Sequence, residues 1–164
     1  AVTGREGGRK RNIVTSLELD SAMMEKNNER FQRTYREIER NEVRYEAKYT
    51  EDADYLIVAF GSIARICQKA IDDARKQGIK VGLIRPITLW PFPYDAIREA
   101  AKNVKGILCV EINAGQMIED VRLAVSDSVP VTHFGRMGGI VPNPQEVLDA
   151  LEKDFIKPSD TPKA

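Results

Sequence analysis

The amino-acid sequence predicts an α/β protein, a three-layer α/β/α sandwich built on a mostly parallel sheet. Short apolar runs at 56–60 (LIVAF), 81–84 (VGLI) and 107–110 (ILCV) are typical of parallel strands that are covered on both faces. Segments with helical apolar spacing separate these runs, and this alternation predicts right-handed βαβ units. The 164 residues are enough for one domain with a substantial core, with or without an extra segment.

Two further strands complete the predicted sheet. Apolar and charged residues alternate from Val43 to Tyr49, which predicts an edge strand with one buried face and one solvated face. Residues 131–134 (VTHF) form a weaker strand pattern before a glycine-containing loop. Together with the three apolar runs, these segments predict five strands.

Helices are expected after each of the inner strands. Apolar residues keep helical spacing over 63–74, with Ser62 as the expected N-cap and Gly78 as the stop. The ranges 97–104 and 118–125 repeat this spacing. A final helix, with apolar positions at 147, 148 and 151, is predicted by a cap, a first-turn proline and an N3 carboxylate: Asn143, Pro144 and Glu146.

Composition divides the chain into three parts. Residues 1–42 are expected to be an inter-domain connector, with a basic, glycine-rich arm (1–15) that is either a solvated linker or a phosphate clamp. A highly charged helix follows at 20–42, and its narrow apolar stripe suits a helix that lies on another surface: Met24, Phe31, Tyr35 and Ile38. Residues 43–155 form the α/β domain, and 156–164 form a tail. The chain begins with alanine, and we expect it to be a piece of a longer polypeptide.

Charge and cysteine content exclude several classes of protein. The chain has 25 basic and 25 acidic residues, so its zero net charge gives no whole-chain attraction for nucleic acid or an anionic membrane. The longest apolar run, 55–61, is far shorter than the roughly 18 residues of a membrane helix, and no signal-peptide pattern is present. Two cysteines are too few for an iron–sulfur cluster or a structural zinc site. We expect a soluble, cytoplasmic protein without a metal site of its own.

Candidate site residues lie in the loops that follow the parallel strands, because ligands and partners of open sheets meet these loops. Gly61 and Ser62 form either a serine-capped turn or an anion site at a helix start. The loop 135–139, with Arg136 as its cation, is either a plain turn or a phosphate cradle. Neither segment has the spacing of a dinucleotide or Walker motif.

The segment 85–93 (RPITLWPFP) is the most distinctive loop. Its prolines stiffen a backbone that carries Trp90 and Phe92, which predicts either an interface or a cap folded onto the core. Arg85 and Glu111 each end a buried strand, and they are interpreted either as a structural ion pair or as a pair that binds a substrate or partner.

No catalytic group stands out in the sequence. His133 has no acidic neighbour along the chain, so we interpret it as a structural histidine. Cys67 lies on an apolar helix stripe and Cys109 lies within a buried strand, which is typical of small core residues. With no nucleophile–base pair, carboxylate dyad or metal cluster, we assign no catalytic residue and expect the isolated chain to be inactive.

Four segments resemble the α subunit of 2-oxoacid:ferredoxin oxidoreductases, most closely the 2-ketoisovalerate (3-methyl-2-oxobutanoate) member. They are DADYLIVAFGSIARI (52–66), KVGLIRPITLWPFP (80–93), VEINAGQMIEDVRLAV (110–125) and HFGRMGG (133–139), and they occur in the same order and at the same spacing. SLELD (16–20) resembles the family's inter-domain connector. The resemblance covers about residues 12–150.

This resemblance implies a fold and a role. It implies a domain similar to the transketolase C-terminal domain, with five strands of which the first is antiparallel. The whole enzyme would convert a 2-oxoacid and CoA to acyl-CoA and CO2 and reduce ferredoxin, with thiamine diphosphate, Mg²⁺ and iron–sulfur clusters. The implied partners are an N-terminal pyrimidine-binding domain of the same polypeptide, a diphosphate-binding β subunit, other subunits and ferredoxin.

The resemblance also implies which residues line an interface or a site wall. Those that match the family's motifs are Gly61, Ser62, Arg85, Trp90, Phe92, Glu111, Asn113, Gly115 and Gln116, and Arg136 joins them as the loop cation. The leading hypothesis is a structural and interface domain of a multi-subunit thiamine enzyme. One alternative is a free-standing module that binds a phosphate group or CoA. Another is the matching domain of a transketolase or 2-oxoacid dehydrogenase.

Overall fold

The computed structural model describes residues 6–8, 10 and 16–157, which fall into two compact units divided after Ile38. The first unit holds a short 3-10 helix, η1 (Glu6–Gly8), and most of α1 (Ser21–Asn41). Asp20 caps α1, since its Oδ1 accepts hydrogen bonds from the N–H groups of Ala22 and Met23. No residue of α1 is buried, and no helix in the described ranges is long and apolar enough to span a membrane. The predicted boundaries at residues 42 and 155 stay predictions.

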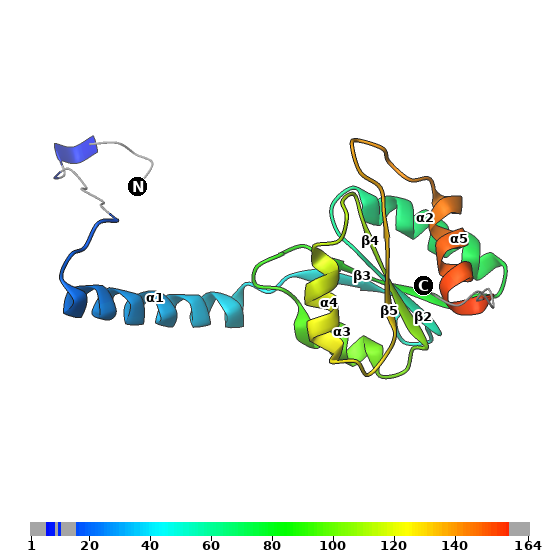
Figure 1. The fold of residues 1–164 in the computed structure, drawn as a ribbon, viewed down its shortest axis with the longest axis horizontal. Helices are drawn as coiled ribbons and strands as arrows, with labels where there is room; N and C mark the ends of the chain where they lie inside the picture. The colour runs from blue at the N-terminus through cyan, green and yellow to red at the C-terminus, as the bar shows by residue number, and fades with distance from the viewer. Residues whose placement is uncertain (1–5, 9, 11–15, 158–164) are drawn as a thin grey trace, which may run out of the picture. The chain divides into compact units, whose positions relative to one another are not determined.

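A five-stranded sheet forms the centre of the second unit, with the strand order β1-β3-β2-β4-β5 (Figure 1). β1 runs antiparallel to β3, and the other neighbours are parallel, as expected. The strands are β1 (Tyr45–Lys48), β2 (Tyr55–Ala59), β3 (Val81–Pro86), β4 (Gly106–Glu111) and β5 (Val131–Gly135).

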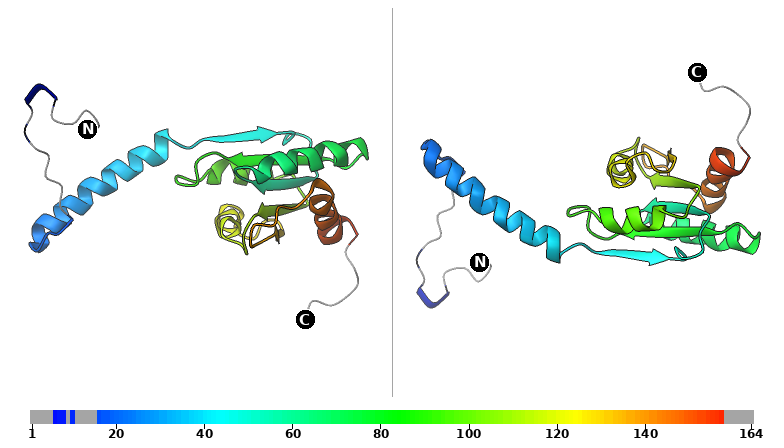
Figure 2. Two further views of the ribbon diagram at one scale, coloured as in Figure 1. Left: turned by 90° about the horizontal axis from the view of Figure 1, so that it is seen from above. Right: turned by 90° about the horizontal axis from the view of Figure 1, so that it is seen from below.

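Helices cover both faces of this sheet and produce two separate cores (Figures 1 and 2). α2 (Ile63–Lys76) and α5 (Pro144–Leu151), with the π-helical turn η2 (Glu152–Ile156) after α5, pack on one face. α3 (Tyr94–Ala101) and α4 (Met117–Val125) pack on the other. Cys67 lies in the first core and Cys109 in the second, so the prediction that both are small core residues is confirmed.

The edge strand differs from its prediction in one respect. β1 does lie at the edge of the sheet, but all four of its residues are exposed, and Tyr45 retains 45% of its surface. The expectation of one buried face was wrong. Alternation of apolar and charged residues shows which side chains share a face, but burial requires a covering element, and no described helix buries the Tyr45 face of β1.

Two predicted helix caps have opposite outcomes. Asn143 forms a complete capping box: its Oδ1 accepts from the Glu146 N–H at 3.0 Å, and the Asn143 N–H donates to Glu146 Oε2 at 2.8 Å. Ser62 makes no side-chain cap hydrogen bond, so that prediction was wrong. Its backbone is already helical (φ −70°, ψ −33°), whereas a capping side chain needs an extended backbone. Gly61, with φ +63°, makes the turn instead.

These two positions provide a matched pair for a stability measurement. Asn143→Ala is expected to lower the free energy of unfolding by about 1 kcal/mol, because it leaves the Glu146 N–H in the first turn of α5 without its acceptor. Ser62→Ala is expected to change it by less than about 0.5 kcal/mol. Urea unfolding of both variants checks this, and equal losses at the two positions would contradict the cap assignments.

Candidate functional site: the carboxyl edge of the sheet

The topology brings the predicted loops together at one edge of the sheet. β2 and β4 are neighbours, but β2 continues through α2 to β3 on one side, and β4 continues through α4 to β5 on the other. The loops after β2 and β4 therefore flank the point where the strand order reverses, which is the usual ligand and partner position in open α/β sheets.

Glu111 is fully buried at the end of β4, and its carboxylate binds the start of α4. It accepts hydrogen bonds from the N–H groups of Gln116 (3.2 Å), Met117 (2.9 Å) and Ile118 (3.1 Å). A helix N-terminus carries free N–H groups and partial positive charge, so it stabilises this carboxylate. Glu111 is thus an internal cap that holds the 112–116 loop against the helix.

The predicted pairing of Arg85 with Glu111 was wrong. Arg85 Nη1 instead donates to Glu46 Oε2 at 3.1 Å, across the β1–β3 ladder in which the two residues are direct neighbours. β2 lies between β3 and β4, so the ends of the Arg85 and Glu111 strands are not adjacent.

The surroundings of Glu111 determine its ionisation. Burial by itself would raise the pKa of this carboxyl group, but hydrogen bonds from the backbone N–H donors and from the Asn113 side chain outweigh burial, so the pKa lies below its ordinary value of 4.5. The group is therefore a carboxylate at neutral pH, and it is occupied by α4.

The remaining residues of this loop cluster pack tightly beside Glu111. The Gly115 N–H donates to Asn113 Oδ1 at 2.7 Å. Gly135 has no room for a side chain, because a Cβ there would lie 2.2 Å from the Asn113 carbonyl oxygen. These contacts pack the 112–116 loop closely against the end of β5.

His133 has an acidic neighbour that the sequence did not reveal. Its Nε2 lies 3.7 Å from Glu111 Oε1. This nitrogen atom is buried and has no hydrogen-bond partner among the described residues. The β4–β5 register, which pairs Cys109 with His133 and Glu111 with Gly135, creates this proximity. This distance is longer than a hydrogen bond, and the carboxylate already accepts hydrogen bonds from the N–H groups of α4. Glu111 therefore does not orient His133 as a general base.

The loop after β3 combines both of its predicted roles. Phe92 retains only 5% exposure and belongs to the α3/α4 core, whereas Trp90 is 55% exposed. A cis peptide joins Trp90 and Pro91, and Thr88 Oγ1 donates to the Pro91 carbonyl at 2.8 Å. The loop therefore caps the core with one aromatic ring and presents the other to solvent.

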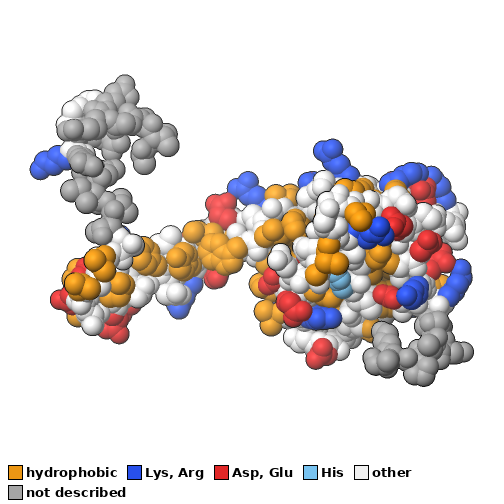
Figure 3. Space-filling view, turned by 45° about the horizontal axis from the view of Figure 1, so that its top comes forward, with side chains coloured by type: hydrophobic (Ala, Val, Ile, Leu, Met, Phe, Trp, Pro, Cys, Tyr) orange, Lys and Arg blue, Asp and Glu red, His pale blue; other side chains and the backbone are white. Residues whose placement is uncertain are grey.

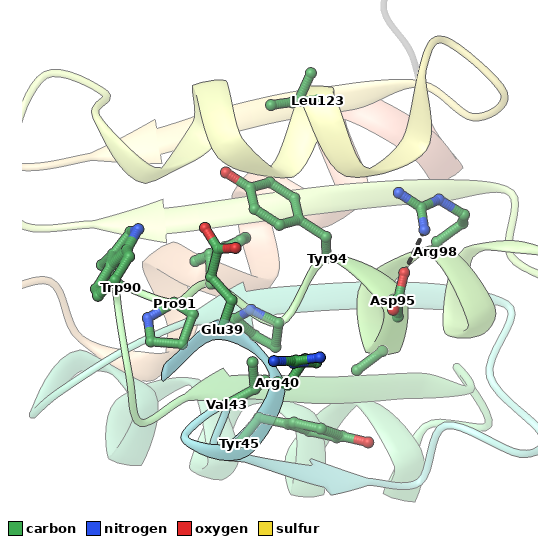
Figure 4. A pocket seen from close by; sticks show the side chains of 13 residues that line it. Glu39, Arg40, Val43, Tyr45, Trp90, Pro91, Tyr94, Asp95, Arg98 and Leu123 are labelled. Atoms are coloured by element: carbon green, nitrogen blue, oxygen red, sulfur yellow. Dashed lines mark hydrogen bonds and ion pairs between the residues drawn. The ribbon is translucent and has the colours of Figure 1, made fainter. Parts of the chain in front are cut away.

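A groove of about 860 Å³ lies beside Trp90 (Figure 4). Val43, β1, the 90–93 loop, α3 and α4 contribute its apolar lining, which also includes Tyr45, Phe92 and Leu123. Tyr94 extends over the groove, and its hydroxyl donates to Asp120. That hydrogen bond raises the pKa of Tyr94 to about 12, so the phenol is neutral at physiological pH.

Exposed apolar side chains follow three of the parallel strands. Isolated exposed apolar residues are common, but these residues lie in loops that meet at one edge of the sheet. Figure 3 shows hydrophobic side chains on the face that carries the single histidine. Two nearby arginines are already paired, Arg85 with Glu46 and Arg136 with Glu146 at 2.7 Å. The exposed residues are Ile87, Leu89, Trp90, Ile112, Met137, Ile140 and Val141.

Both cysteine thiols are buried, and we expect them to be unreactive in the folded chain. Burial raises the pKa of Cys67 to about 12, and burial and the nearby Glu111 carboxylate also raise the pKa of Cys109. Because the thiolate is the reactive form, Ellman's reagent at pH 8 is expected to label neither cysteine in the folded chain and both after denaturation. Rapid labelling of the native protein would show that a core is open.

In the described part of the chain, no cluster of His, Cys, Asp and Glu is suited to hold a metal ion.

The family model of the pyruvate:ferredoxin oxidoreductase core domain II matches residues 53–147 of this chain. The matched residues run from β2 through β5 into the first half of α5, and they leave out β1. The chain belongs to this family of domains.

Three individual proteins are similar to this chain, one in sequence and two in fold. It is 46% identical over 143 residues to the ketoisovalerate oxidoreductase subunit VorB of Methanothermobacter thermautotrophicus, a match that covers 87% of this chain and 40% of that subunit. The 2-oxoglutarate:ferredoxin oxidoreductase from Magnetococcus marinus has the same fold, with a TM-score of 0.76 and 21% identity, over 93% of this chain and 28% of that one. A split-gene transketolase shares the fold with a TM-score of 0.57 and 20% identity, over 67% of this chain and 40% of that one. The transketolase-like fold is thereby confirmed.

Proposed function

We propose that this chain is the core domain II portion of a subunit of a 2-oxoacid:ferredoxin oxidoreductase that acts on ketoisovalerate. The whole enzyme would convert the 2-oxoacid and CoA to acyl-CoA and CO2 and pass two electrons to ferredoxin. The 46% identity to VorB supports this reaction and substrate. The chain spans 40% of that subunit's length, so the remaining parts of the enzyme would supply the rest of the active site.

Within that enzyme, we assign this domain a structural and interface role. The observation that carries this role is the set of exposed apolar side chains on the carboxyl-edge loops, with Trp90 the largest of them. Buried aromatic anchors dominate the binding energy of protein interfaces, and a rigid loop presents such an anchor at little entropic cost. Gly61 and Ser62, which follow β2 beside the point where the strand order reverses, would contribute to the same interface.

The cofactors expected of such an enzyme do not fit the residues described here. Thiamine diphosphate needs a Mg²⁺ site, but the described residues contain no cluster of His, Cys, Asp and Glu that could hold a metal ion. The iron–sulfur clusters need cysteine ligands, but the two cysteines are buried in separate cores. Glu111, a fully buried carboxylate, is occupied by α4. We therefore assign thiamine diphosphate, Mg²⁺ and the iron–sulfur clusters to other domains and subunits, with CoA as co-substrate.

The phosphate- or CoA-binding module is the less favoured alternative. It would use the turn at Gly61 and the Gly135–Gly139 loop, whose cation is Arg136. That guanidinium is engaged by Glu146, the N3 residue of the α5 capping box. A phosphate group would have to compete with this carboxylate.

Calorimetric titration of the chain separates these functions. No heat with thiamine diphosphate–Mg²⁺ or with CoA is expected for an interface domain. Saturable CoA binding that is lost in Arg136→Ala would instead support the binding module, and tight binding of thiamine diphosphate would contradict the assignment of its site to other domains.

The activity itself is tested in the assembled enzyme. The complete set of subunits should reduce an electron-accepting dye in the presence of CoA and ketoisovalerate, with a lower rate on 2-oxoglutarate. Equal or greater activity on 2-oxoglutarate would overturn the substrate assignment. Dehydrogenase-type activity without iron–sulfur subunits would favour the second alternative, a domain of a different thiamine enzyme.

A further inference from the structure

The outer edge of β1, on the side away from β3, is an unpaired strand edge among the described residues. β3 is its one neighbour in the sheet, and β1 forms the border of the sheet in Figure 2. Its four residues are exposed, and neither proline nor a bulge interrupts them. Edge strands of this kind present free N–H and C=O groups that pair with another strand.

The backbone groups that face outward can be identified from the ladder. The Arg44 carbonyl accepts from the Ile87 N–H at 2.9 Å, and the Arg44 N–H donates to Thr88 Oγ1 at 3.0 Å, so both groups of Arg44 point toward β3. Hydrogen-bonding direction alternates along an antiparallel strand. The N–H and C=O groups of Tyr45 and Ala47 therefore point away from the sheet.

The charges along this edge are self-complementary. Glu46 is half exposed and pairs with Arg85, whereas Lys48 takes part in no ion pair among the described residues. If a second copy pairs antiparallel with Ala47 opposite Ala47, Glu46 of each copy lies opposite Lys48 of the other. The same register makes Ala47 a hydrogen-bonded pair, and opposite charges directly across a ladder stabilise it.

We propose that β1 is a homodimerisation edge, at which two copies of this chain pair antiparallel about Ala47 and join their sheets. The pairing is isologous, because each copy offers the same strand to the other. It also places Tyr45 diagonal to Ala47 of the second copy, within reach of an aromatic ring. Tyr45 and Ala47 border a hollow with Ala96 and Ala100 of α3, so pairing would cover apolar surface that is exposed in one copy.

Sedimentation of the full 164-residue chain over a concentration series at low ionic strength tests this proposal. The chain is expected to show a monomer–dimer equilibrium that salt weakens. Glu46→Lys and Lys48→Glu are each expected to weaken the dimer about tenfold or more, because each substitution places like charges opposite one another twice. An equimolar mixture of the two variants should form heterodimers, since the two lysines on the edge of one variant then face the two glutamates on the edge of the other.

Two further variants keep this test specific. Ala47→Pro removes an outward N–H and no hydrogen bond to β3, so it should weaken the dimer while the melting temperature stays near that of the wild type. Lys153→Glu, an exposed charge reversal in η2, should leave association unchanged. A chain that stays monomeric overturns the proposal. So does a dimer that is insensitive to the β1 variants, or a mixture that forms no heterodimer.

Discussion

Glu111→Gln is expected to lower the free energy of unfolding by about 2–4 kcal/mol at pH 7, a large effect for a nearly isosteric change. The carboxylate accepts hydrogen bonds from three N–H groups at the start of α4. A glutamine amide would offer one acceptor oxygen and turn its own NH2 group toward these donors. It would also remove the negative charge that the helix N-terminus favours. Urea unfolding measured with circular dichroism gives the value.

The effect of Glu111 on stability depends on pH in a defined direction. The pKa of this carboxyl group is lower in the folded chain than its ordinary value of 4.5. Its contribution is therefore fully present above pH 4.5 and is lost as the pH falls through the lowered folded-state pKa. The difference between wild type and Glu111→Gln should accordingly shrink in acid.

Glu119→Gln provides the control for this prediction. Glu119 lies on the same helix, but its side chain is 72% exposed and its partner is the surface residue Arg122. It is expected to change the free energy of unfolding by less than about 0.5 kcal/mol. If both variants lost the same stability, Glu111 would not act as the internal cap of α4.

Trp90→Ala is expected to weaken assembly with the other subunits by at least tenfold, or about 1.4 kcal/mol or more, while the chain itself stays folded. Trp90 is the largest exposed apolar residue of the carboxyl-edge loops, held by a loop that Thr88 and Phe92 fix in place. Arg85→Ala is expected to act in the same direction, since its ion pair with Glu46 is partly exposed and contributes little to folding. Affinity of the chain for its partner subunits, and activity of the assembled complex, measure both effects.

Phe92→Ala separates an interface role from a folding role within the same loop. Phe92 is buried in the α3/α4 core, so its truncation should lower the free energy of unfolding by about 3–5 kcal/mol. Trp90→Ala should lower it by less than about 1 kcal/mol, because the indole is mostly exposed. Unchanged assembly and activity in Trp90→Ala, or melting lowered as much as in Phe92→Ala, would refute the interface assignment.

The fold could be predicted from the sequence to a large extent, because its signals are local. Continuous apolar runs predicted the buried parallel strands, and helical spacing predicted the helices between them. Asn143 and Glu146 signalled a capping box, which needs only residues three apart on one chain segment. The edge position of β1 followed from its alternation, as did the core positions of Cys67 and Cys109 from their neighbours.

The candidate site could be predicted only in part, because its contacts join residues far apart in the chain. The loops that carry the unusual residues, among them Arg85, Trp90 and Glu111, could be identified from the sequence. The roles of these residues depend on tertiary structure: strand order separates Arg85 from Glu111, and the β4–β5 register brings His133 beside Glu111. Local periodicity records which side chains share a face, but it carries no information on which strands become neighbours or on which faces remain uncovered.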